Sequence, residues 1–115
     1  MIPSEETILE AIQIAREMLN GNMHLILGCR ILRNLSLKSG LYEDNIFTPF
    51  IAVDSETDHF PIGKMRDLCD LDYLKRVDVE INEYLDIERP YIITSCQNLI
   101  NKFEQRRTNT EHISN

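Results

Sequence analysis

The chain has 115 residues, of which 43% are hydrophobic and 27% charged, and its formal net charge is −7. This length suits one domain with one modest core, and the composition argues against wholesale disorder. No apolar run approaches the roughly 18–20 residues needed to span a bilayer, and the first residues lack the basic and apolar regions of a signal peptide. We therefore expect a cytoplasmic protein that does not enter a membrane.

The first forty residues predict two helices joined by a short turn. Ser4 is a suitable N-cap, and apolar residues recur every three or four positions over residues 5–19. Asn20-Gly21 supplies the stop, because glycine accepts the left-handed conformation that follows a helix. Asn22 is the expected cap of a second helix, which ends at Ser39-Gly40. The short connection favours an antiparallel hairpin.

Residues 41–69 show no sustained period and are expected to form a long ordered loop that could contain short helices. Within it, Phe50–Val53 fits either a short strand or a buried helical turn, and periodicity does not separate the two. Thr48-Pro49 and Pro61–Gly63 punctuate the two sides of this stretch.

Two more helices are predicted after the loop. Asp70 or Asp72 would cap the third, and Arg89-Pro90 would start the fourth, because proline is favoured in the first turn of a helix. The expected architecture is an all-α bundle of four main helices. It would form a single domain over residues 1–106, followed by a flexible polar tail over 107–115.

The negative charge is concentrated in one region. Residues 43–88 contain thirteen acidic and four basic residues, a net charge of −9, while the remainder is slightly positive. An acidic surface repels nucleic acid and attracts basic partners. Nucleic-acid binding is therefore the least favoured of the binding functions.

The densest group of potential ligands is Asp54-Ser55-Glu56-Thr57-Asp58-His59. Its first, third and fifth positions resemble a calcium loop, but the sixth is His59 instead of glycine and the twelfth is Met65 instead of glutamate. Imidazole with carboxylates could hold a transition metal only with ligands from a second element. The three cysteines form no C-x-x-C pair, and there is no nucleophile elbow or phosphate-binding glycine loop. We predict no metal, no cofactor and no catalytic residue.

The same stretch also has a structural interpretation, in which Asp54 or Ser55 caps a short helix. Its conformation decides the direction of the carboxylates. In an extended segment Asp54, Glu56 and Asp58 share one face, whereas in a helix Asp54 and Asp58 stack and Glu56 points away.

In size, acidity and lack of catalytic machinery, the chain resembles bacterial toxin-immunity proteins, including those of contact-dependent growth-inhibition systems. The resemblance implies an inhibitor that binds a basic, nuclease-type toxin through an acidic surface. Carboxylates would form the interface, with Phe60 or Tyr73 as an aromatic anchor. The predicted partner-binding residues are Asp54, Glu56, Asp58, Phe60, Asp67, Asp70, Asp72 and Tyr73.

Two other functions remain open from the sequence. One is a metal-dependent enzyme that uses the Asp54–His59 cluster. The other is an oligomeric regulatory or scaffold protein that uses the broad apolar face predicted for residues 22–39. The sequence leaves the oligomeric state undetermined.

Overall fold

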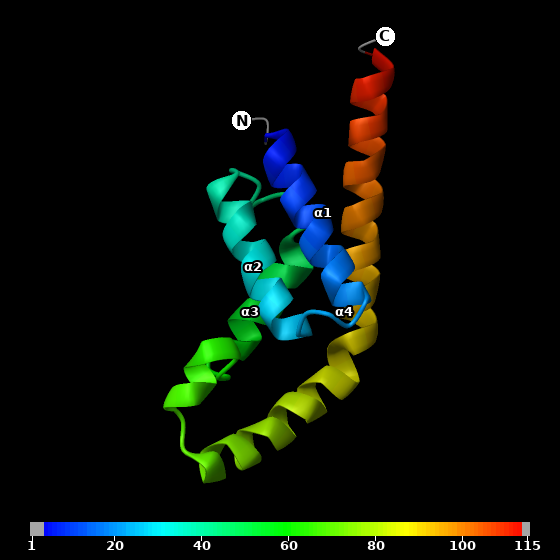
Figure 1. Ribbon diagram of the computed structural model, residues 1–115. Helices are drawn as coiled ribbons and strands as arrows, with labels where there is room; N and C mark the ends of the chain where they lie inside the picture. The colour runs from blue at the N-terminus through cyan, green and yellow to red at the C-terminus, as the bar shows by residue number, and fades with distance from the viewer. Residues whose placement is uncertain (1–3, 114–115) are drawn as a thin grey trace.

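The computed structural model describes residues 4–113, and within this range the chain is all-helical with no strand (Figure 1). The all-α prediction with four main helices is confirmed. The elements are α1 (Glu5–Leu19), α2 (Leu25–Lys38), α3 (Thr48–Thr57), the 3₁₀ helix η1 (Gly63–Leu68) and α4 (Leu71–Ile113).

Helices α1 and α2 form the expected hairpin, and most of their boundaries follow the sequence signals. The Ser4 hydroxyl accepts a hydrogen bond from the Thr7 amide, and Gly21 takes the left-handed conformation with φ of 79°. The N-cap of α2 was predicted wrongly, because it is His24 and not Asn22. The Nδ1 atom of His24 accepts the Ile26 amide at 3.1 Å, the bond that a shorter polar side chain usually makes.

The long connection contains helices of its own. Helix α3 starts at Thr48 with Pro49 in its first turn, where the missing amide costs no hydrogen bond. Of the two conformations open for Phe50–Val53, the structure has the helical one. Asp54 therefore lies in the C-terminal half of α3 and does not cap its start.

Residues 71–113 form one helix, although two were predicted. Pro90 lies inside α4 instead of starting a new helix. It leaves the Asp86 carbonyl without its usual partner and forces a bend, which Figure 1 shows in the yellow part of α4. Leu85 and Ile92 are buried on either side of the bend, so packing holds the helix together across it.

The end of α4 also differs from expectation. The helix continues to Ile113 instead of ending by residue 106. The Arg107 Nε atom lies 2.9 Å from Glu5 Oε1 at the start of α1. Residues 114–115 of the expected tail lie outside the described range, and the tail's flexibility stays a prediction.

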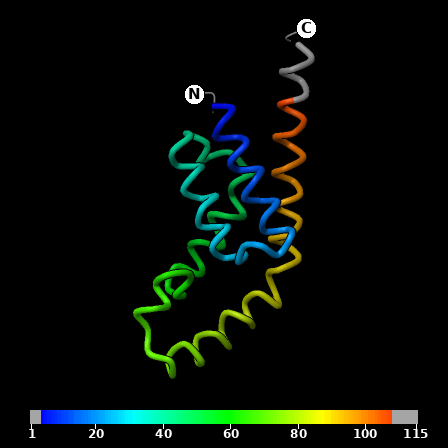
Figure 2. Tube along the Cα trace, in the orientation of Figure 1, coloured from blue at the N-terminus to red at the C-terminus, as the bar shows by residue number. Residues whose placement is uncertain are grey.

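The molecule is elongated, with principal extents of 59 × 25 × 23 Å, and its two ends are built differently. We call the first the bundle: α1, α2, α3 and the part of α4 after Pro90. We call the second the arm: η1 and the part of α4 before Pro90. In the trace of Figure 2 the arm leads away from the bundle.

The bundle holds the aromatic core, in which Phe47, Phe50 and Phe103 are almost completely buried. No helix among the described residues is both long enough and apolar enough to cross a membrane.

Candidate protein-binding surface

The first of the predicted carboxylates, Asp54, faces α2 and not the solvent. Its two oxygens lie 3.4 Å from Arg30 Nε and 3.3 Å from Arg33 Nε, and only 17% of its side chain is exposed. Its charge is therefore compensated within the fold. A carboxylate near the C-terminal end of a helix opposes the helix dipole, and the two arginines offset that penalty.

Arg30 also closes the end of α3. Its guanidinium donates hydrogen bonds to the carbonyl oxygen of Thr57, the last residue of α3, and to that of Phe60 in the connection that follows. Asp54 and Arg30 thus fix how α3 docks on α2.

The helical conformation points Glu56 away from Asp54, as expected, whereas Asp58 follows the last helical residue, Thr57. Glu56 accepts a hydrogen bond of 3.0 Å from the Tyr84 hydroxyl of α4. Burial, the hydrogen bond with Glu56 and the nearby charge of Glu88 raise the pKa of Tyr84. Asp58, just past the end of α3, is exposed and lies 3.8 Å from His59 Nδ1.

Phe60 faces inward. It is 6% exposed, and its ring packs against His59 at 4.3 Å and edge-on against Tyr84 at 6.4 Å between centroids. Phe60 therefore anchors the connection after α3 to the arm, and its side chain offers little surface to a partner.

The remaining predicted residues gather where η1 turns into α4. We call residues 67–73 the tip. Asp70 caps α4, because its Oδ1 accepts the Asp72 amide at 3.0 Å. Asp67 and Asp72 are exposed, and 38% of Tyr73 is exposed. The structure thus brings Asp67, Asp70, Asp72 and Tyr73 together.

Between these carboxylates the tip exposes two leucines. Leu68 is 88% exposed and Leu71 is 75% exposed. Leu68 ends η1 and Leu71 begins α4, where the chain reverses direction at the far end of the arm (Figure 1). Isolated exposed leucines are common, but two neighbours enclosed by acidic groups form a small apolar patch with a charged rim.

Apolar residues and carboxylates are also exposed together farther along α4 in the arm. Val79 and Ile87 are exposed by more than half. The exposed carboxylates between and beside them are Glu80, Glu83 and Asp86.

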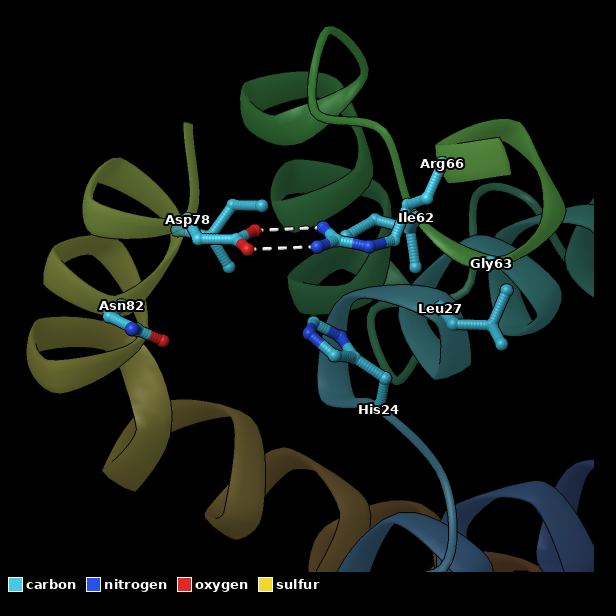
Figure 3. Close-up of a pocket in the computed structure, with 8 residues that line it drawn as sticks. His24, Leu27, Ile62, Gly63, Arg66, Asp78 and Asn82 are labelled. Carbon is cyan, nitrogen blue, oxygen red and sulfur yellow. Dashed lines mark hydrogen bonds and ion pairs between the residues drawn. The ribbon is translucent and has the colours of Figure 1, made fainter. Parts of the chain in front are cut away.

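A cleft of about 360 Å³ separates the arm from the start of α2 (Figure 3). Arg66 of η1 reaches Asp78 of α4 through two hydrogen bonds of 2.8 Å. Figure 3 shows this pair spanning the space, with His24 and Asn82 lining it. The hydrogen bonds from Arg66 lower the pKa of Asp78, and we call the pair the strap because it ties η1 to α4 within the arm.

His24 stands in a positive environment on the other side of the cleft. Partial burial and the charges of Arg66, Arg30 and Arg89 lower its pKa. The imidazole is thus favoured in its neutral form, in which Nδ1 can accept the α2 amide.

The structure does not assemble the expected alternative ligand cluster. Among the described side chains, no three His, Cys, Asp or Glu residues lie close enough together to hold a metal ion. His59 stacks on Phe60, and Asp54 turns away from it toward α2.

Two features of this surface were not found from the sequence. The exposure of Leu68 and Leu71 depends on the end of the arm being uncovered, which no local pattern records. The Arg66–Asp78 pair joins a 3₁₀ helix to a helix twelve positions later. The one available signal was the run Asp-Leu-Cys-Asp-Leu-Asp over residues 67–72, in which each leucine directly follows an acidic residue.

Comparisons with protein-family models, with curated proteins and with solved structures gave no match for this chain.

Proposed function

We propose that this protein is a protein-binding inhibitor that engages a basic partner through the tip. The observation that carries the proposal is the exposure of Leu68 and Leu71 between Asp67, Asp70 and Asp72. An apolar centre with a polar rim is the usual arrangement of a protein–protein interface.

The two kinds of residue contribute differently. Burying one leucine side chain against a partner is worth about 1.5–3 kcal/mol before the cost of association, so Leu68 and Leu71 supply affinity. The carboxylates accelerate association with a positively charged surface and disfavour acidic competitors. Because the three acidic residues of the tip have no cation partner among the described residues, their charge is available to a partner.

A nuclease-type toxin is the partner class that this chemistry fits best. An enzyme that holds a polyanionic backbone needs a basic surface, and an acidic tip competes for that surface. In this proposal Asp58 and Glu56 contribute long-range charge, while Asp54 and Phe60 hold the connection between α3 and the arm. The function is that of an immunity protein.

The test compares two variants that differ from the wild-type chain by the same charge. The tip variant is Asp67→Lys, Asp70→Asn and Asp72→Lys, in which asparagine keeps the capping oxygen of residue 70. The control variant is Glu6→Lys, Glu10→Gln and Glu43→Lys, which changes exposed carboxylates of the bundle. Each protein is used to isolate stoichiometric partners from the source cells, and the dissociation constant of the purified partner is then measured.

We expect the wild-type and control proteins to hold one basic protein, and the tip variant to bind it at least tenfold more weakly. One equivalent of wild-type protein should suppress cleavage of nucleic acid by that partner. Equal binding by the tip variant, an acidic partner, or an unaffected nuclease activity would contradict the proposal. Light scattering of the free protein completes the test, because self-association through Leu68 and Leu71 would assign the tip to a dimer instead.

A further inference from the structure

A second surface feature lies between α3 and the bend of α4. It is a slot of about 130 Å³, smaller than the cleft behind the arm. Its floor is apolar and well packed, because Phe50, Val53 and Ile92 line it and are each less than 7% exposed. A slot with such a floor suits one extended side chain rather than a whole small molecule.

Two carboxylates from different helices line the slot. Glu56 of α3 has one hydrogen bond, from Tyr84, which leaves most of its acceptor capacity unused. Glu88 of α4 is half-buried and makes no hydrogen bond or ion pair with any described residue. Both also lie near Tyr84, because Glu56 accepts its hydrogen bond and Glu88 follows it by one helical turn in α4.

This situation differs from that of three other partly buried carboxylates, each of which faces a cation. Asp54 is compensated by two arginines, and Asp44 lies 2.7 Å from Lys102 Nζ. Asp78 is paired with Arg66, so the larger cleft supplies its own counter-ion. Glu88 beside the apolar slot lacks such a cation, and a bound ligand can provide it.

An exposed aromatic ring completes the rim. Tyr91 lines the slot together with its buried residues and is itself 68% exposed. A ring beside two carboxylates and above an apolar floor matches the three parts of a long basic side chain. The aliphatic stem lies on the floor, the cationic head meets the carboxylates, and the ring face attracts the cation.

We propose that the slot binds an arginine side chain of the basic partner. This rests on the proposed function, because it assumes that the partner is basic. Arginine fits better than lysine, because its planar guanidinium can stack on Tyr91 while it donates two parallel hydrogen bonds to Glu88. At 1.5 Å per residue the slot lies about 25 Å along α4 from the tip, so it is a separate contact.

The slot can be tested without the partner. The protein is titrated with N-acetyl-arginine amide, and the backbone amide shifts of Ala52, Tyr91 and Ser95 are followed by NMR. N-acetyl-citrulline amide is the matched ligand, because it keeps the shape of arginine and lacks its charge. We expect saturable shifts with arginine, at least tenfold weaker binding of citrulline, and weaker binding of N-acetyl-lysine amide.

Two variants locate the site. Glu88→Gln should weaken arginine binding at least fivefold, and Tyr91→Leu should weaken it by a smaller factor. Glu80→Gln removes an equivalent exposed carboxylate elsewhere on α4 and should leave the affinity unchanged. Equal binding of arginine and citrulline, no saturable binding, or an unchanged affinity in Glu88→Gln would overturn the proposal. Equal binding of lysine would overturn the choice of arginine.

Failure of the slot proposal can be distinguished from failure of the proposed function at the tip. If the tip variant keeps its partner while arginine still binds the slot, the tip assignment fails alone. If the tip variant loses its partner and arginine does not bind, the slot assignment fails alone.

Discussion

The bundle and the arm use the same residue types for different purposes. In the bundle, charged residues meet partners far away in sequence, as in the pairs Arg16–Glu104 and Asp44–Lys102, both with distances of 2.7 Å. In the arm, the strap is the only ion pair that the described residues show.

Their apolar groups differ in the same way. In the bundle the ring of Phe47, just before α3, packs against that of Phe103 of α4, and their centroids are 6.0 Å apart. The arm buries one face of α4 through Val77, Ile81 and Leu85 and leaves the leucines of the tip outside. Stability is thus concentrated in the bundle, and the unpaired surface is concentrated in the arm. Four experiments can break or sharpen this contrast.

The largest effect is expected from Phe50→Ala in the bundle. Phe50 is completely buried, and truncation of such a ring typically costs about 3–5 kcal/mol of unfolding free energy through lost burial and the remaining cavity. Urea denaturation followed by circular dichroism measures it. A loss below 1 kcal/mol is closer to that of a substitution on the surface, and it would show that the core is not where the structure places it.

Arg30→Ala comes next. It removes the hydrogen bonds to the carbonyl oxygens of Thr57 and Phe60 and takes a cation from the largely buried Asp54, so we expect a loss of about 2–3 kcal/mol. The same denaturation experiment measures it. Arg33→Ala is the control and should cost less. Arg33 is more exposed, and it pairs with Asp54 but not with the carbonyl oxygens of Thr57 and Phe60. Equal losses would contradict the capping role.

Breaking the strap should affect the arm and spare the bundle. In Asp78→Asn, amide hydrogen exchange should quicken in residues 74–85 while the protection of α1 stays unchanged. The wild-type arm should show the same change on acidification. Because the folded-state pKa of Asp78 is lowered, its contribution is present above the usual carboxyl pKa of about 3.9 and is lost as the pH falls through the folded value.

The asparagine variant should lack this part of the pH dependence. Uniform loss of protection in both regions would mean that the arm and the bundle unfold as one unit.

The smallest effect on stability is expected at the tip. The pair Leu68→Ser and Leu71→Ser should change the free energy of unfolding by no more than about 0.5 kcal/mol, because both side chains are already in water. The measurement is again the urea midpoint, with Leu85→Ser as the buried comparison on the same helix. A large loss at the tip would show that it packs against another part of the molecule.

The sequence predicted the fold well where signals were local. Ser4, Gly21 and Gly40 mark the ends of α1 and α2 because caps and left-handed glycines act within one turn of the chain. Pro90 misled the prediction because the same residue can start a helix or bend one. The choice depends on whether both flanking segments bury an apolar face.

The surface was predicted only in part. Asp67, Asp70 and Asp72 lie together because they are close in sequence at a helix start. Asp54 and Phe60 could not be placed, because their directions depend on Arg30 and Tyr84, which come from other helices. The conformation of residues 48–57 was left open, and the helix directs Asp54 toward α2 and Glu56 toward α4.

By itself, the sequence determined an all-helical chain, its first two helices and a regional excess of negative charge, because composition, period and capping are local properties. The tertiary structure alone decided which carboxylates are paired within the fold and which present their charge to the solvent. Burial against a second helix requires a counter-ion, as for Asp54, whereas a helix end that leads away from the core leaves its charges and its leucines in water.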